Sequence, residues 1–157
     1  MDINLINPLI VSFTEILPQL GFQSVERLGT SLIGSTLEYD GVLVHISLVG
    51  TLKGAVLIGM SLDSAKYFAS KMMMGMTVTE FDPMAQSAIS EMVNMVCANA
   101  CTQFSKVAII GLDISPPLLL IGSNIQATLP VPQTFQIHFS VDSIDIHVYV
   151  GLLQVNN

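Results

Sequence analysis

Three polar side chains recur at helical spacing in a part of the sequence that is mostly apolar. Ser87, Glu91 and Asn94 are separated by four and then three positions, which places them on one stripe of a helix. Glu91 is the only charged residue between Met84 and Ser105. An unpaired carboxylate is not left inside a hydrophobic core, so this stripe is expected to face solvent or a partner. The carboxylate can pair with a cation, and the amide can both donate and accept hydrogen bonds.

The stripe has two interpretations. Polar stripes on helices are usually the solvated face of an amphipathic helix. An ordinary solvated face, however, carries several Lys, Glu or Arg side chains, whereas this one offers a hydroxyl, one carboxylate and one amide among small or apolar neighbours. That composition favours a docking face with a few specific polar contacts.

The overall composition limits which partners such a face can meet. The chain has 157 residues, of which 51% are hydrophobic and 11% charged, and its mean hydropathy is +0.66. It is too apolar for a disordered protein, and it has enough apolar residues for a full core and a subunit interface. Twelve acidic and five basic residues give a net charge of −7. This balance argues against binding to nucleic acid or to an anionic membrane.

A charge-free run over residues 114–137 raises the question of a membrane span. Four prolines and several amides interrupt the run, so it contains no apolar stretch of about eighteen residues. The N-terminus has no basic region ahead of an apolar one, so no secretory signal is predicted. We expect a cytoplasmic protein with a single domain over residues 1–157, because no Pro-, Gly- or Ser-rich linker divides the chain.

Hydrophobic periodicity predicts the elements that position the stripe. Helical spacing indicates helices over 5–21, 62–75 and 82–107. The expected N-cap is Asn7 for the first helix, either Ser61 or Asp63 for the second, and Asp82 for the third. Alternating or extended patterns indicate strands over 26–38, 42–48, 55–60, 118–121, 135–141 and 144–152. Short turns between strands favour antiparallel pairing. The order predicts an α+β fold, with helices on one face of an antiparallel sheet and two pseudo-symmetric halves of one helix and three strands.

The two cysteines offer little chemistry. Cys97 and Cys101 lie one helical turn apart, so a disulfide between them would constrain nothing. Two thiols are also too few for a structural zinc site. We interpret both as small buried residues.

Histidines on the last two predicted strands form a further candidate site. A two-residue turn at Asp142-Ser143 would place His138 opposite His147, with Asp145 on the same outer face. This group has the donors for a divalent cation, but an exposed strand face or a subunit contact is the simpler interpretation. His45 is isolated on its strand and receives no role.

The segment from Ser87 to Asn94, followed by Pro117, resembles the signature of the CheC/CheX/FliY family of chemotaxis phosphatases. In that signature, Asp or Ser is followed after three intervening residues by Glu, after two more by Asn, and after twenty-two more by Pro. Ser87, Glu91, Asn94 and Pro117 fill the four positions here. Other segments resemble the CheX branch, so the similarity covers nearly the whole chain: Asn7-Pro8-Leu9-Ile10, Lys53-Gly54-Ala55-Val56, Met72-Met73-Met74-Gly75 and residues 117–122.

The resemblance implies the activity and the roles of the site residues. Members of the family hydrolyse the aspartyl phosphate of the response regulator CheY. By analogy, Asn94 enters the regulator's active site and orients the attacking water, and Glu91 pairs with a Lys of the regulator. Ser87 has a supporting role, and Pro117 shapes the loop beside the helix. The chain itself is expected to bind no metal or cofactor, because Mg²⁺ belongs to the regulator.

Two departures from the family pattern are visible. Members with two sites carry a second stripe on their first helix, whereas this chain has Glu15 there with Pro18 in place of the Asn. One site per chain is therefore expected, as in CheX. In addition, Ala98 stands before Asn99, where relatives often have Gly.

Quaternary structure and catalysis leave alternatives open. CheX-type proteins dimerise by joining their sheets, and either the hairpin 135–152 or the strands within 24–61 could supply the edge of a homodimer. The alternative to a phosphatase is a domain of the same fold that docks a regulator or a flagellar component without catalysis. An intact Glu91/Asn94 pair favours the enzyme.

Overall fold

A computed structural model describes residues 3–155 of the chain, as three α-helices, one short 3-10 helix and seven strands. The helical elements are η1 (Ile3–Leu5), α1 (Asn7–Gln19), α2 (Leu62–Met72) and α3 (Pro83–Ser105). The strands are β1 (Val25–Ile33), β2 (Thr36–Val49), β3 (Leu52–Met60), β4 (Asp113–Ile114), β5 (Leu118–Thr128), β6 (Thr134–Val141) and β7 (Ile144–Gln154).

All seven strands join one antiparallel sheet in the order β1-β6-β7-β3-β2, with both β4 and β5 pairing to β2. The order is internally symmetric. If β1 is exchanged with β5, β2 with β6 and β3 with β7, every strand pairing is reproduced except that of the short β4. The two halves therefore pair in the same way around the central β3–β7 ladder. The α+β class and the pseudo-symmetric halves expected from the sequence are confirmed.

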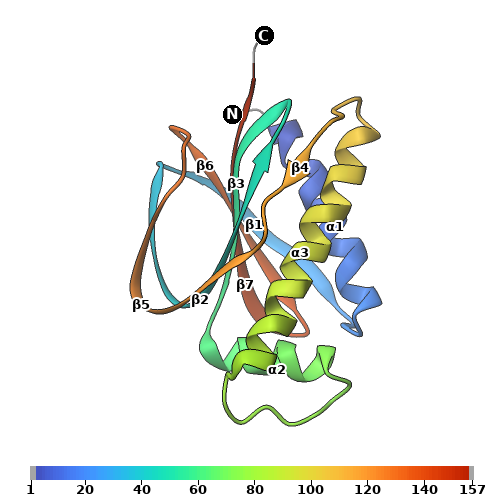
Figure 1. Cartoon of the computed structure of the whole chain (residues 1–157), viewed down its shortest axis with the longest axis vertical. Coiled ribbons are helices and arrows are strands. Elements are labelled where there is room, and N and C mark those ends of the chain that lie inside the picture. Colours follow the sequence, from blue (N-terminus) through green and yellow to red (C-terminus); the bar gives the residue numbers. More distant parts are fainter. Residues whose placement is uncertain (1–2, 156–157) are drawn as a thin grey trace.

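The helices cover one face of the sheet. In Figure 1, α1 and α3 lie on one side of it and α2 closes its lower end, while β2 and β5 bow away on the opposite side. The main core fills the space between sheet and helices, where residues such as Val44, Ile46, Val56 and Phe104 are fully buried. This arrangement buries one side of α3 and leaves the other side of that helix free for a site.

A smaller apolar cluster lies on the other face of the sheet. Its buried members come from β2, β3, β7 and the connection after β5, and are Leu43, Ala55, Leu57, Leu129, Val131 and Tyr149. Tyr39 packs across Gly59, where an added methyl group would come within 2.5 Å of the Tyr39 ring. The bowed ends of β2 and β5 are thus anchored onto the sheet.

Several boundaries differ from the sequence-based expectations. Helix α1 has Ile6 as N-cap instead of Asn7, because the 3-10 turn runs directly into the helix and Ile6 is fully buried. The expected strand 26–38 is two strands, since the chain turns at Gly34-Ser35. The caps Ser61 and Asp82 are confirmed by side-chain hydrogen bonds to Ser64 and Ala85. Within residues 3–155, no helix is long and apolar enough to cross a membrane.

Gly54 lies where the two halves of the sheet meet. A Cβ atom at this position would lie 1.9 Å from the backbone oxygen of Gly151 and 2.9 Å from its carbonyl carbon. Because backbone atoms on a paired strand cannot rotate away, Gly54→Ala should lower the free energy of unfolding by about 1–3 kcal/mol or more. Urea unfolding measures this change. Gly29→Ala is the matched control, because nothing lies within 4 Å of its added methyl group, and equal midpoints for the two variants would contradict the prediction.

The hairpin of β6 and β7 has the register predicted from its turn. Asp142 and Ser143 form a two-residue turn with φ of 48° and 67°, and His138 pairs with His147. The two rings stack with centroids 4.9 Å apart, and His138 Nε2 lies 2.7 Å from Asp145 Oδ1. Among residues 3–155 no group of three or more His, Cys, Asp or Glu side chains is placed to hold a metal ion.

The histidine pair predicts how stability depends on pH. The pKa of His147 is lowered below 6.5, first by burial of its ring and second by repulsion from His138. The negative charge of Asp145 acts in the opposite direction but has the smallest effect. Burial also lowers the pKa of His45. A pKa lowered in the folded state means that protonation favours the unfolded chain. The stability that these rings contribute is therefore present above pH 6.5 and lost as the pH falls through their folded-state pKa values.

Unfolding midpoints at a series of pH values check this dependence. The wild-type midpoint should fall as the pH decreases below 6.5, and His147→Gln should show a smaller decrease over the same interval. A midpoint that rises on acidification, or a variant that follows the wild type at every pH, would contradict the assignment.

Candidate functional site: a groove beside helix α3

Helix α3 displays the predicted stripe on its free side. The helix starts at Asp82, whose carboxylate accepts a hydrogen bond from the Ala85 N–H, and Pro83 follows at the first helical position. Ser87 and Glu91 are exposed, and Asn94 is half-buried. Nine residues of the helix are buried against the sheet, α1 and α2, which leaves the stripe on the opposite side: Ala85, Ile89, Met92, Val93, Val96, Cys97, Ala100, Gln103 and Phe104.

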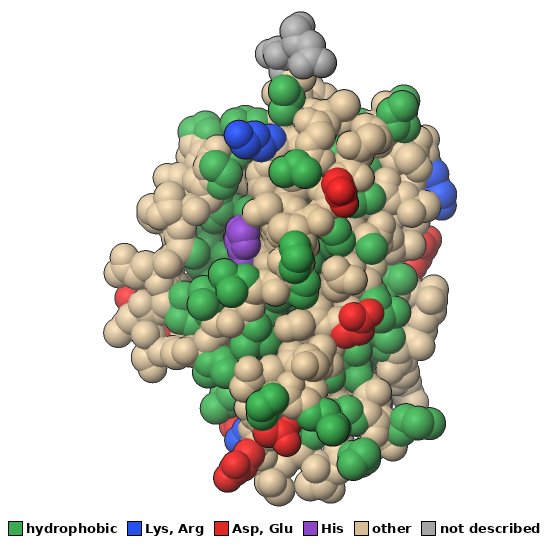
Figure 2. Space-filling model, in the orientation of Figure 1, with side chains coloured by type: hydrophobic (Ala, Val, Ile, Leu, Met, Phe, Trp, Pro, Cys, Tyr) green, Lys and Arg blue, Asp and Glu red, His purple; other side chains and the backbone are tan. Residues whose placement is uncertain are grey.

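The stripe forms one wall of an open groove of about 760 Å³. The opposite wall is the connection between β4 and β5, including Ser115, Pro116 and Pro117, and apolar side chains of Ile114 and Leu119 also line it. The structure therefore brings together all four residues of the predicted signature, which are Ser87, Glu91, Asn94 and Pro117. On the face that carries α3, acidic side chains lie singly among apolar and neutral atoms along the right of the view and gather at its lower end (Figure 2).

The side chains of the Glu91/Asn94 pair have no polar partner in the described part of the chain. Among residues 3–155, the Glu91 carboxylate and the Asn94 amide make no hydrogen bond or ion pair. Half-buried polar groups in folded proteins normally have a partner. An amide and a carboxylate left free along one groove are thus available to a second molecule.

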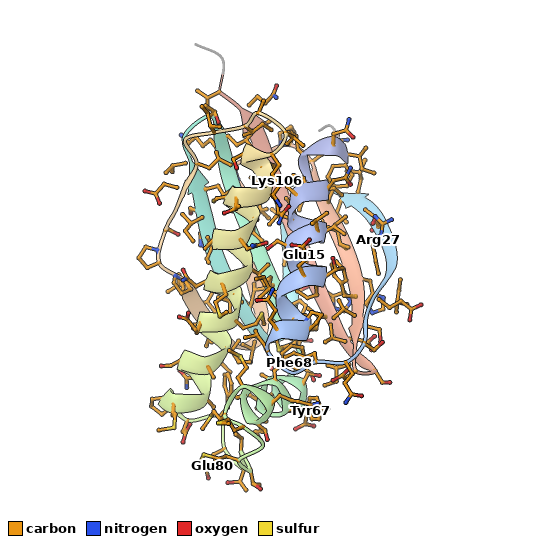
Figure 3. The ribbon with its side chains drawn as sticks, turned by 90° about the vertical axis from the view of Figure 1, so that its right-hand side faces the viewer. Glu15, Arg27, Tyr67, Phe68, Glu80 and Lys106 are labelled. Carbon is orange, nitrogen blue, oxygen red and sulfur yellow. The ribbon has the colours of Figure 1, made fainter. Side chains whose placement is uncertain are left out.

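The corresponding position on α1 is used differently. Gln103 of α3 donates a hydrogen bond from Nε2 to Glu15 Oε2 at 3.0 Å, and Figure 3 shows Glu15 between the two helices. Ser12 of α1 also donates to the carbonyl of Val96 at 2.5 Å. Together with Pro18 inside α1, these contacts show that this face of α1 holds α3 in place.

Other candidate residues lie outside the groove. Cys97 is buried and burial raises its pKa to about 12, while Cys101 is partly buried with a raised pKa, also through burial first. A thiol with a raised pKa is a poor nucleophile, which agrees with a packing role. Neither cysteine nor the His138/His147 pair is among the residues that line the groove.

Some residues of the groove were not found from the sequence. Ser90 and Gln86 line it from α3, and Ser115 and Pro116 line it from the opposite wall. A Ser directly before a Pro-Pro pair is a signal for a chain that leaves a strand, because proline cannot donate to a ladder. That signal is present at residues 115–117.

The fold and the groove place the chain in a known structural class. It resembles a chemotaxis protein CheX from Desulfovibrio desulfuricans with a TM-score of 0.82 at 15% identity, covering 98% of this chain and 100% of that one. It also resembles the structure described as a CheX-CheY-BeF3-Mg²⁺ complex from Borrelia burgdorferi, with a TM-score of 0.78 at 23% identity and coverage of 98% and 100%. The class is that of CheC-like α+β proteins.

The sequence narrows this class to one family. The family described as "Chemotaxis phosphatase CheX" matches residues 42–140. The protein named "CheY-P phosphatase CheX" from Thermotoga maritima is 28% identical over 157 residues, covering 96% of this chain and 97% of that protein. The chain belongs to the CheX family of chemotaxis phosphatases, as the resemblance of its signature and of the surrounding segments predicted.

Proposed function

We propose that this protein hydrolyses the aspartyl phosphate of a CheY-like response regulator, with the groove beside α3 as its docking site. The observation that carries the proposal is the free Glu91/Asn94 pair opposite Pro117. Family membership and the similarity to a CheY-P phosphatase from Thermotoga maritima support the substrate class. The Borrelia burgdorferi structure described as a complex with CheY, BeF3 and Mg²⁺ supports a regulator as the partner.

Asn94 is the residue that we assign to the attacking water. Phosphoryl transfer has a loose transition state, so a strong general base contributes little and correct placement of the water contributes much. A carboxamide accepts one hydrogen bond and donates another without titrating, which suits this placement. Mg²⁺ and a Lys of the regulator would neutralise the charge, so the phosphatase supplies neither.

Glu91 and the outer groove residues are assigned to docking. The Glu91 carboxylate, one turn before Asn94, would pair with a Lys of the regulator and thereby set the depth at which Asn94 enters. Ser87 would support this contact from the preceding turn, and Pro117 would hold the opposite wall. These roles account for the whole stripe without any further charged group in the chain.

Catalysis and simple docking give different results in a phosphate-release assay. A regulator charged with acetyl phosphate is mixed with a substoichiometric amount of this protein, and phosphate release is followed over several turnovers. An enzyme releases many equivalents of phosphate per chain. A non-catalytic docking module leaves the release unchanged or slows it, and that result would overturn the proposal.

We also propose a homodimer formed through a sheet edge, in the cytoplasm. The hairpin 135–152 does not supply this edge, because β6 lies between β1 and β7, and β7 lies between β6 and β3. Among the described strands, β1 pairs only with β6, and it exposes Leu28 and Leu32 at 51% each. Of the two candidate edges, only the strands within 24–61 remain, and we assign the dimer contact to the unpaired side of β1. Sedimentation of a single-chain mass at micromolar concentration would contradict the dimer.

A further inference from the structure

The wall of the groove opposite Asn94 is built by an arch in the sheet. Leu48 of β2 pairs with Ile114 of β4, and His45 of β2 pairs with Leu118 of β5. Three residues of the connection, 115–117, therefore stand opposite only two residues of β2, 46 and 47. Two of the three are prolines, which have no N–H to donate, so the connection cannot continue the ladder and bends out of it.

Ser115 replaces the missing backbone acceptor at the base of this arch. Its N–H donates to the carbonyl of Ser47 at 2.9 Å, as in a regular ladder. The N–H of Ser47, however, donates to the Ser115 hydroxyl oxygen at 2.8 Å. The hydroxyl donates in turn to the carbonyl of Pro116 at 3.2 Å. The Ser115 hydroxyl thus accepts the hydrogen bond from the Ser47 N–H that the Ser115 carbonyl would accept in a regular ladder. The Ser115 carbonyl is therefore free to turn away from β2 with the prolines.

We infer that Ser115 is a positioning residue of the phosphatase site, which sets the distance between Pro117 and the Glu91/Asn94 stripe. Without the hydroxyl, the partly buried N–H of Ser47 has no acceptor, and unsatisfied groups of this kind are costly. The Ser115 carbonyl then turns back toward β2 to accept the Ser47 N–H, which draws Pro117 away from α3 and widens the groove. This inference rests on the proposed function, because it concerns how the same groove receives a regulator.

Kinetics of Ser115→Ala against a phosphorylated regulator test the inference. Since Ser115 supports the docking wall and touches no reacting group, we expect KM to rise about 5- to 10-fold and kcat to change by less than about 2-fold. Ser115→Thr keeps the hydroxyl and should restore the wild-type KM. If Ser115→Ala is too unstable to assay, Ser115→Cys keeps the size and weakens the acceptor, and should give an intermediate KM.

A matched control separates positioning from general stability. Ser61 also accepts a backbone N–H bond, from Ser64 at 3.1 Å, but at the start of α2 and outside the groove. Ser61→Ala should lose a similar hydrogen bond without raising KM. Hydrogen exchange at the Ser47 amide should become faster in Ser115→Ala and stay slow in Ser115→Thr and Ser61→Ala.

The outcomes distinguish this inference from the proposed function. A wild-type KM in Ser115→Ala, equal KM changes in the Ser61 and Ser115 variants, or a failure of Thr to restore KM would overturn the inference alone. An absence of turnover by the wild-type protein would overturn the proposed function, and the Ser47 exchange rates would still show whether Ser115 holds the arch.

Discussion

Asn94→Ala should reduce the phosphatase rate at saturating regulator by at least about 100-fold, to the rate at which the regulator loses its phosphate alone. The amide is the group assigned to the attacking water, and alanine offers no hydrogen bond in its place. The affinity for the regulator should change by less than about 3-fold, because Asn94 is half-buried in the groove and carries no charge. Stopped-flow decay of the phosphorylated regulator and a separate binding titration measure the two effects.

The nearest matched control for Asn94→Ala lies on the same helix. Asn99 is also half-buried on α3 but is not among the residues that line the groove. Asn99→Ala removes the same kind of side chain from the same helix and should leave the phosphatase rate within about 2-fold of the wild type. Wild-type turnover in Asn94→Ala, or an equal loss in both variants, would contradict the assignment of the water to Asn94.

Glu91→Ala should weaken binding of the regulator as well as the rate. The loss of one partner of a charge pair across an interface costs about 2 kcal/mol or more, which corresponds to about 30-fold in Kd. The dependence of Kd on salt concentration should also become weaker, since ions screen the attraction between Glu91 and the regulator's Lys. Binding titrations at low and high salt measure both changes.

Glu15→Gln is the control for the removal of a carboxylate. Glu15 occupies the related position on α1 but accepts a hydrogen bond from Gln103, and glutamine keeps an acceptor oxygen there. This variant should bind and dephosphorylate the regulator as the wild type does. If Glu15→Gln weakened binding as much as Glu91→Ala, the regulator would be docking on α1, and the proposed site would be wrong.

The sequence predicted the stripe and the hairpin register because both follow from local periodicity. A helix repeat fixed which side of α3 carries Glu91, and a two-residue turn fixed the pairing of His138 with His147. The sheet order did not follow from such local rules. The pairing of β1 with β6 joins segments at opposite ends of the chain, and nothing in either segment specifies the other.

The opposite wall of the groove shows the same limit. Pro117 was found only through the spacing of a family signature, whereas its neighbour Ser115 was missed. The role of Ser115 depends on Ser47, which is 68 positions away in the chain. Likewise, the bond from Ser12 to Val96 spans 84 positions. Side-chain hydrogen bonds between distant backbones depend on the assembled sheet, so spacing rules do not find them.

The interleaved sheet has a consequence for how the chain reaches this structure. The first half contributes β1, β2 and β3 and the second contributes β5, β6 and β7, but β1 is separated from its own half by β6 and β7. Neither half has a complete sheet until both have been made, so a ribosome must finish nearly the whole chain before the sheet can be completed. Loop closure between such distant segments is slow. We expect refolding in milliseconds to seconds, and two fragments cut between α2 and α3 should each remain unstructured until they are mixed.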